Sequence, residues 1–236
     1  MDEAALFLIP VTLGETPVSK VLPAYNREII VSLRYFIVEN VRTARRFLKQ
    51  TEPEINIDEL TFFTLNKHTS REDLSGFLQP VKDGFPVGVL SEAGCPAIAD
   101  PGADVVALAQ QKQIPVVPLV GPSSILLSLM ASGFNGQNFA FSGYLPIDTE
   151  QRVKTLKTLE QRMISENQTQ IFIETPYRNN AMAETILKTL KPSTRFCIAA
   201  DITLETEWIK TQSIADWKKQ KLPDLSKRPS IFLVGK

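Results

Sequence analysis

Short apolar runs alternate with longer amphipathic segments along most of the chain. Runs of this length are typical of strands, and the spacing of apolar residues between them is typical of helices. The predicted strands of the first half are residues 6–10, 35–39, 61–65, 86–90 and 115–119. Those of the second half are residues 139–146, 170–175, 195–201, 205–210 and 229–235. This alternation predicts an α/β protein.

The helical pattern is clearest over residues 41–49, 74–84, 149–167 and 179–190. In the first of these segments one face is apolar, and the opposite face carries Arg42, Arg45, Arg46 and Lys49. The second segment contains Pro80, which predicts that its helix ends or bends there.

The segment "LVGPSS" (119–124) interrupts two apolar runs near the middle of the chain. We therefore predict two domains, residues 1–119 and 120–236. The later strands of the second half follow one another through short turns, which indicates antiparallel pairs. The expected architecture is a mostly parallel N-terminal sheet and a mixed C-terminal sheet, each with flanking helices.

Composition narrows the class of protein. With 43% hydrophobic and 22% charged residues, the 236-residue chain is typical of globular proteins. No apolar run approaches the ~20 residues of a membrane span, and the first ten residues do not have the pattern of a secretory signal. Because there are only two cysteines, we expect a reducing cytoplasm. The 26 basic residues equal the 26 acidic ones, which argues against a protein devoted to binding phosphate backbones.

An unusual stretch, "SEAGCPAIADPG" (91–102), follows the predicted strand 86–90. In an open parallel sheet, ligands bind beyond the carboxyl ends of the strands, where this stretch would lie. Asp100 and Pro101 have the pattern of a helix start, so we expect a structural role for Asp100. Glu92 is placed either to receive hydroxyl groups of a ligand or to lie in solvent as an ordinary loop acid.

A second loop, "GPSS" (121–124), has a similar design, with Pro122 at a predicted helix start, Ser123 and Ser124 in its first turn, and Gly133 at its end. The chain contains no phosphate-binding glycine loop and no zinc-ligand spacing, so no metal is expected. His68 is the only histidine, which makes a Ser-His-Asp hydrolase improbable. Cys95 lacks a histidine nearby in sequence and is expected to be inert.

The segments "LSEAGCPAIADPG", "GPSS", "ASGF…FSGYLP" and "FIETPYR" occur in this order along the chain. Together they resemble the tetrapyrrole methylase superfamily, and within it most closely the ribosomal RNA small subunit methyltransferase I family. "FIVENVR" and "LNKHTSRED" are similar to two further motifs of that family, so the likeness covers nearly the whole chain.

This resemblance implies a two-domain α/β enzyme, commonly a homodimer, that methylates a cytidine ribose 2′-hydroxyl of ribosomal RNA with S-adenosyl-L-methionine. The cofactor is expected in a cleft between the domains. The implied cofactor residues are Leu13, Gly14, Ser91, Glu92, Ala93, Gly94, Cys95, Ser123, Ser124, Glu174, Ala199 and Ala200. The candidates for a general base are Glu39, Glu174 and His68, because each matches a family motif.

The chain also departs from the family's motifs. The first loop keeps Gly14 but moves its proline, and Glu92 stands where the family has aspartate. A later motif reads "ADITLE" and lacks the family's arginine and lysine, and the sequence ends at the last predicted strand, where family members often continue. These departures concern the substrate more than the cofactor.

The sequence therefore does not decide which molecule accepts the methyl group. Arg42 and its basic neighbours on the helix 41–49, together with Arg178, could contact RNA phosphates, or they could form a solvated face and a local pair. The alternatives to an RNA methyltransferase are a methyltransferase for another acceptor, such as a tetrapyrrole-like small molecule, and a cofactor-binding protein that has lost turnover.

Overall fold

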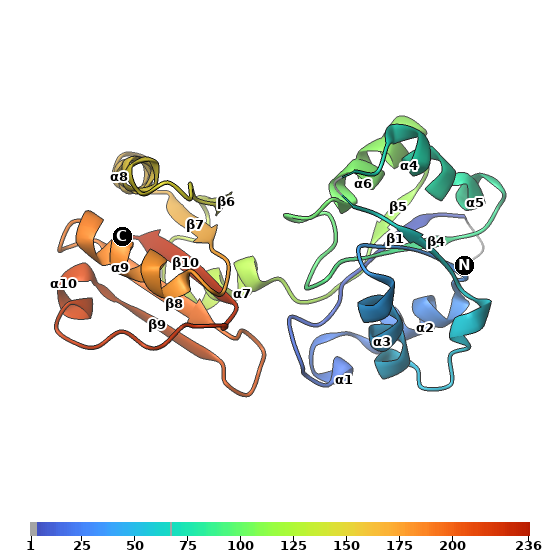
Figure 1. Ribbon diagram of the computed structural model, residues 1–236, viewed down its shortest axis with the longest axis horizontal. Coiled ribbons are helices and arrows are strands. Elements are labelled where there is room, and N and C mark those ends of the chain that lie inside the picture. Colours follow the sequence, from blue (N-terminus) through green and yellow to red (C-terminus); the bar gives the residue numbers. More distant parts are fainter. Residues whose placement is uncertain (1–3, 67) are drawn as a thin grey trace. The chain divides into compact units, whose positions relative to one another are not determined.

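The computed structural model describes residues 4–66 and 68–236. The chain forms two compact units, Met1–Ser123 and Ser124–Lys236. Each unit has a sheet of its own with flanking helices (Figure 1). The first unit thus ends at Ser123, whereas the sequence placed the boundary at residue 119.

Within the described residues, the sheet of the first unit is five-stranded and entirely parallel, with the order β3-β2-β4-β1-β5. Its strands are β1 (Leu6–Ile9), β2 (Tyr35–Val38), β3 (Thr61–Thr64), β4 (Val87–Leu90) and β5 (Val116–Pro118). Strand β4 lies between β1 and β2, and all four of its residues are buried. Burial on both faces explains why this strand is a continuous apolar run in the sequence.

Helices cover both faces of this sheet (Figure 1). One layer consists of α1 (Val18–Val21), α2 (Ala24–Ser32) and α3 (Val41–Thr51), followed by the short 3-10 helix η1 (Ile57–Glu59). The other consists of α4 (Arg71–Phe77), α5 (Gln79–Lys82) and α6 (Gly102–Gln111). The apolar stripe of α3 supplies Ala44, Phe47 and Leu48 to the core, as its periodicity predicts.

The sheet of the second unit is mixed, with the order β6-β7-β10-β8-β9 among the described residues. Its strands are β6 (Phe139–Tyr144), β7 (Thr169–Ile173), β8 (Arg195–Ala200), β9 (Trp208–Ser213) and β10 (Ser230–Gly235). Strands β6 and β7 are parallel, whereas β10 is antiparallel to β7 and β8, and β9 is antiparallel to β8. The prediction of a mixed C-terminal sheet is confirmed.

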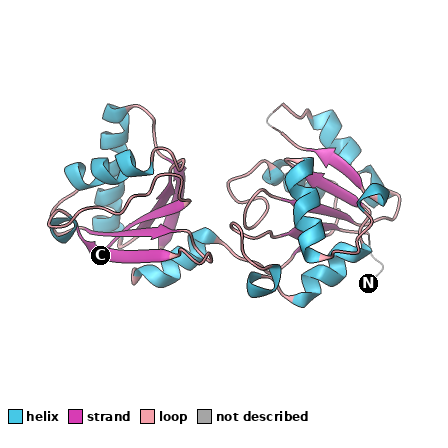
Figure 2. Ribbon diagram, turned by 60° about the horizontal axis from the view of Figure 1, so that its bottom comes forward, coloured by secondary structure: helices cyan, strands magenta, loops and turns pink. Residues whose placement is uncertain are grey.

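The helices of the second unit are α7 (Ser124–Ser132), α8 (Thr149–Glu166), α9 (Asn179–Thr189) and α10 (Ile214–Trp217). Helices flank this sheet as well (Figure 2). Helices α8, α9 and α10 cover one face, where Phe172, Phe196, Phe232 and Trp217 form the centre of the core. Helix α7 packs on strands β8, β9 and β10, and Thr211 Oγ1 of β9 donates to Ser132 O at its end (2.8 Å).

Several elements differ in their bounds from the predictions. The predicted helix 74–84 begins earlier, at Arg71, because Ser70 and Asp73 form a capping box, and it is interrupted at Leu78 before Pro80. Strand β9 starts at Trp208 instead of residue 205. The preceding residues form a turn in which Asp201 and Thr203 have left-handed backbone conformations.

Candidate functional site

The carboxyl ends of the parallel strands β1 to β5 lie along one edge of the first sheet. The connection that leaves β1 leads to α1 and α2 on one face, whereas the connection that leaves β4 leads to α6 on the other. In an open α/β sheet, ligands bind in the crevice where neighbouring connections diverge in this way. The loops 10–17 and 91–101 mark this position, because β1 and β4 are hydrogen-bonded neighbours.

A hydrogen bond from Val11 N to Gly94 O (3.0 Å) joins these two loops. Ser91 Oγ donates to the same carbonyl oxygen (3.1 Å). Gly94 has a φ of +73°, and a Cβ atom there would lie 3.0 Å from Leu13 Cδ2 and 3.2 Å from Pro122 O. Glycine is required both by the left-handed conformation and by the close approach of its neighbours.

The segment that follows β5 packs against the same two loops. Cys95 Sγ lies 3.4 Å from Pro122 O, and a Cβ atom on Gly121 would lie 2.2 Å from Pro10 Cβ. Leu13, Gly94 and Cys95, all predicted to hold the cofactor, are thus brought together, with Ser123 next in sequence to Pro122. Burial raises the pKa of the Cys95 thiol, which keeps it protonated and unreactive.

A cavity of about 190 Å³, called here the strand-end cavity, lies beside these loops. Among the predicted cofactor residues, Leu13, Gly14, Ser91 and Glu92 line it. Its wall is made by loop residues 11–15, by residues 90–92 and by one side of α3, namely Thr43, Ala44, Arg46, Phe47 and Gln50.

Three carboxylates lie close to one another at the ends of β2 and β4. Burial raises the pKa of the Glu39 carboxyl, and the nearby carboxylate of Asp100 raises it further, while the backbone N–H of Glu92 acts in the opposite direction. Glu92 Oε1 accepts a hydrogen bond from Thr43 Oγ1 (2.7 Å) in the first turn of α3. Glu92 is therefore held against a helix, and its carboxylate is close enough to Glu39 to contribute to the raised pKa of that group.

Asp100 has the structural role that the sequence predicts. Its Oδ1 accepts hydrogen bonds from Gly102 N (2.7 Å) at the start of α6 and from Ala97 N (2.9 Å). These bonds fix a tight loop in which Ala97 and Ala99 have positive φ values, a conformation that costs free energy for a residue with a side chain. Burial raises the pKa of Asp100, and the two N–H donors oppose this effect.

His68, the third candidate for a general base, is exposed in the turn between β3 and α4. Its backbone N–H donates to Asn66 Oδ1 (2.8 Å). Strand β3 is at the edge of the sheet, and β2 separates it from β4. Among the described residues, His68 is not part of the wall of the strand-end cavity.

In the second unit, Glu174 follows β7 and is buried. Its Oε1 accepts hydrogen bonds from Arg178 Nη2 (2.6 Å) and from Thr175 N (2.6 Å). Glu174 Oε2 and Arg178 Nε are also buried and have no hydrogen-bond partner among the described groups. Of the two roles left open for Arg178, the local pair is the one observed in this structure.

Ala199 and Ala200 are fully buried at the end of β8. Their strand is hydrogen-bonded on both sides, to β10 and to β9, and Ala200 belongs to the core of the second unit. Ser124 begins α7, and its carbonyl oxygen accepts a hydrogen bond from Ser128 Oγ. The part of these residues in cofactor binding stays a prediction.

The side chains of Thr43, Arg46 and Gln50 line the strand-end cavity but were not singled out as cofactor residues from the sequence. Their spacing is the signal that could have identified them, because residues three and four apart lie on one side of a helix. Arg45 and Lys49 turn to other partners: Arg45 lies over the Phe62 ring, and Lys49 Nζ donates to Pro53 O (2.8 Å). The basic stripe of α3 therefore reaches the cavity through Arg46.

Among the described residues, no group of histidine, cysteine, aspartate and glutamate side chains is arranged to hold a metal ion. No helix in the described ranges has the length and apolar character needed to cross a bilayer.

Comparison with known proteins identifies the family of the chain. No protein-family model matches the chain. A ribosomal RNA small subunit methyltransferase I from Leptospira borgpetersenii is 30% identical over 211 residues, which cover 87% of this chain and 78% of the relative. The chain belongs to this family. Methyltransferases of the same name from Vibrio cholerae (28% identity, 89% of this chain, 69% of the relative) and Buchnera aphidicola (26%, 97% and 77%) are also similar.

Solved structures confirm the fold expected for a member of the ribosomal RNA small subunit methyltransferase I family. The methyltransferase CobJ matches with a TM-score of 0.65 at 14% identity, over 98% of this chain and 94% of that one. A uroporphyrin-III C-methyltransferase from Thermus thermophilus, solved with S-adenosylhomocysteine, matches with a TM-score of 0.56 at 14% identity, over 98% and 97%. The chain therefore has the tetrapyrrole methylase fold.

The joined loops lead to a prediction for Gly94. Replacing Gly94 by alanine should lower the free energy of unfolding by about 1–3 kcal/mol more than replacing Gly84. Both glycines have positive φ values, but a Cβ atom on Gly84 has no neighbour within 4 Å. Urea denaturation measures the difference, and amide hydrogen exchange at Val11 should become faster in Gly94→Ala alone. Equal destabilisation of the two variants, with unchanged exchange at Val11, would contradict this account of the loops.

Proposed function

We propose that this protein transfers a methyl group from S-adenosyl-L-methionine to a ribose 2′-hydroxyl of the RNA of the small ribosomal subunit. The names of the relatives support the class of acceptor, and the strand-end cavity supports the position of the cofactor. The observation that carries the proposal is the meeting of Leu13, Gly14, Ser91 and Glu92 around this cavity at the carboxyl ends of β1 and β4.

The residues of the cavity fit part of such a cofactor. S-adenosyl-L-methionine, when bound, supplies a methyl group attached to a positively charged sulfur. Glu92 offers a carboxylate to positive or hydroxyl groups, and the turn at Gly94 lets the backbone approach closely. The cofactor carries no phosphate, which agrees with the lack of a phosphate-binding loop. Since a whole small-molecule site measures roughly 300–1,000 Å³, a cavity of about 190 Å³ holds only part of the molecule.

On this proposal, the protein accelerates methyl transfer mainly by positioning the cofactor and the acceptor. The protein holds the acceptor hydroxyl in line with the methyl group, an effect worth on the order of 7–11 kcal/mol in the best cases. The hydroxyl must also lose a proton, and Glu39 is the best placed of the three candidates for the base. Glu39 lies next to the cavity residue Glu92, and burial raises its pKa above the usual value of a glutamate. His68 is exposed beyond the neighbouring strand, and Glu174 is already engaged by Arg178.

The basic stripe of α3 supports an acceptor that carries negative charge, such as RNA. Arg46 lines the strand-end cavity, and Arg42 lies one turn earlier on the same side of the helix. An arginine at this position can bind a phosphate oxygen of the acceptor strand while the neighbouring ribose reaches the cavity. The neutral charge of the whole chain is compatible with this contact, because only the local charge at the rim acts on the phosphate.

Methyl transfer to RNA is tested with labelled cofactor and undermodified small ribosomal subunits. We expect the wild-type protein to transfer the labelled methyl group to the subunits. In Arg46→Ala the KM for the subunits should rise. The dependence of log(kcat/KM) on log[salt] should become less steep by about one unit, as for the loss of one phosphate contact. Lys82→Ala removes an exposed positive charge from the opposite helical layer and serves as the control. Transfer to a tetrapyrrole but not to RNA would identify the small-acceptor alternative, and cofactor binding without any transfer would identify a protein that has lost turnover.

The general base leads to a second prediction. Glu39→Gln should lower kcat by about 10²- to 10⁴-fold while the Kd for the cofactor, measured by calorimetry, stays close to that of the wild type. Because the base must be deprotonated, the wild-type rate should fall as the pH drops through the raised pKa of Glu39. This acidic limb should be absent from the residual activity of Glu39→Gln and present in Glu28→Gln, a surface control. An unchanged limb in Glu39→Gln would exclude Glu39 as the base.

We also propose that the protein forms a homodimer through α7. This helix is apolar on nearly all sides, and Met130 is 77% exposed, with Leu126 one turn before it at 49%. An exposed apolar stripe on a helix is typical of a surface that a second protein molecule covers. A two-fold symmetric pair of copies brings the same stripe to both sides of the interface.

Sedimentation velocity tests this assembly. The wild-type protein should sediment as a dimer, and Met130→Asp should shift it to monomer because a charge would be buried at the interface. Gln161→Asp adds the same charge to an exposed position of α8 and should leave the dimer intact. A wild-type monomer at all concentrations, or a dimer that survives Met130→Asp, would contradict the proposal.

A further inference from the structure

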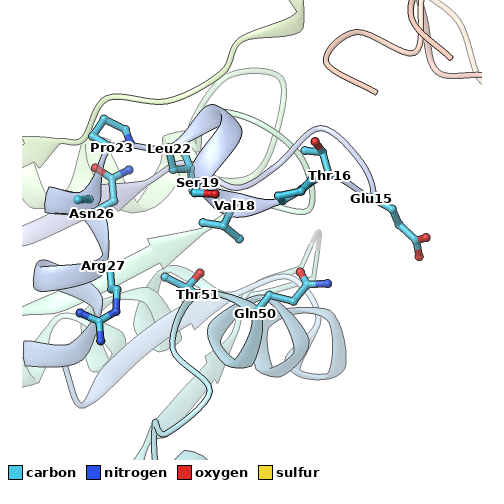
Figure 3. A pocket seen from close by; sticks show the side chains of 12 residues that line it. Glu15, Thr16, Val18, Ser19, Leu22, Pro23, Asn26, Arg27, Gln50 and Thr51 are labelled. Carbon is cyan, nitrogen blue, oxygen red and sulfur yellow. The ribbon is translucent and has the colours of Figure 1, made fainter. Parts of the chain in front are cut away.

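A larger hollow lies next to the strand-end cavity in the first unit. This hollow, called here the α1–α2 pocket, has a volume of about 830 Å³ and is lined by residues 15–19, 22–24, 26–27 and 50–51 (Figure 3). Thr51 and Gln50 at the end of α3 lie across the hollow from Val18 and Thr16 (Figure 3). The two hollows share Glu15 and Gln50 in their walls, so they adjoin each other.

The lining of the α1–α2 pocket is mostly uncharged. Val18, Leu22 and Pro23 provide apolar surface, whereas hydroxyl and amide groups provide hydrogen-bonding positions. The one cationic side chain in the lining, Arg27, forms an ion pair with Glu52, and Glu15 adds a negative charge at the rim. A ligand with several carboxylates would find no available cation among these described residues. A nucleoside, which has an apolar ring face and uncharged polar edges, matches the lining.

Asn26, in the lining of this pocket, is tied to the segment that follows β5. Its side chain is only 1% exposed and its Nδ2 donates to Val120 O (2.9 Å). Its Oδ1 is buried and has no hydrogen-bond partner among the described groups. A buried acceptor left in this state is destabilising unless a ligand or water satisfies it. Because Oδ1 is shielded from solvent, Asn26 fixes the wall of the pocket, and a ligand is left to the accessible polar groups of the lining, such as the Thr16 hydroxyl and the Gln50 amide.

From these observations we infer that the α1–α2 pocket binds a nucleoside of the RNA acceptor, adjacent in the strand to the nucleotide that is methylated. The inference rests on the proposed function, because it assumes that the acceptor is RNA. The shared residues Glu15 and Gln50 place this nucleoside next to the strand-end cavity. The pocket thereby adds recognition of a neighbouring base to a reaction whose target atom belongs to a ribose.

Filling the pocket tests the inference. Ser19 is an exposed residue of the short helix α1, so Ser19→Trp should occupy the hollow without disturbing the core. We expect the KM for undermodified small subunits to rise about tenfold or more, which corresponds to about 1.4 kcal/mol of binding free energy, while kcat and the Kd for the cofactor are retained. Ser32→Trp adds the same side chain at the other end of α2, outside the lining, and is the matched control.

A cross-linking experiment on the wild-type protein keeps the inference testable if Ser19→Trp does not fold. An RNA fragment of the acceptor region that contains 4-thiouridine next to the target nucleotide should cross-link to the peptide 15–27. Cross-links confined to other peptides, or an unchanged KM in a folded Ser19→Trp, would overturn the inference while methylation of RNA by the wild type still stands. Failure of the wild type to methylate or bind any RNA would instead remove the proposed function on which the inference depends.

Discussion

The hydrogen bond between Val11 and Gly94 is the contact on which the arrangement of the site depends, and the parallel pairing of β1 with β4 makes it possible. Parallel strands deliver their carboxyl ends to the same edge, so the loops that follow them must pack together or leave a crevice. Here they do both. Gly94 takes a left-handed conformation against Leu13 and Pro122, and the strand-end cavity remains between this turn and α3. The packing inside β4 is equally tight, since a Cβ atom on Gly88 would lie 2.7 Å from Ile9 Cδ1.

The elements that the sequence predicts well are those in which one local signal dominates. Strand β4 is buried on both faces, so its apolar run identifies it, and the apolar stripe of α3 agrees with the residues that it buries. The sequence is less informative where a turn or a cap competes with the periodicity. The segment 205–210 has strand-forming residues, but the left-handed residues Asp201 and Thr203 extend the turn and move β9 to 208–213. Similarly, the capping box at Ser70 moves the start of α4 to Arg71.

The candidate site was predictable from the sequence to the extent that it consists of loops after strands. Ser91 and Glu92 follow β4 directly, and Gly14 lies in the loop after β1, so the fold alone brings them to one edge. Which side chains of α3 line the cavity depends on the rotation of that helix about its axis. The apolar face of the helix fixes this rotation only approximately. The side chain of Arg46 lines the cavity, whereas Arg45 turns to Phe62, although the two are adjacent in sequence. Pairings between side chains, such as Arg178 with Glu174, are similarly decided by rotamers that the sequence pattern does not specify.

The distribution of charge around the strand ends bears on the proposed function, which requires one small region to bind two ligands of opposite charge. Glu39, Glu92 and Asp100 lie close to one another at the strand ends, and their mutual repulsion is part of the reason that the pKa of Glu39 is raised. Such a group attracts a positively charged sulfur and repels a phosphate. On the proposed function, Arg46 binds the RNA phosphate, although it lines the same cavity as Glu92. The formal net charge of zero is no obstacle to this contact, because the local positive charge of the arginine acts on the phosphate.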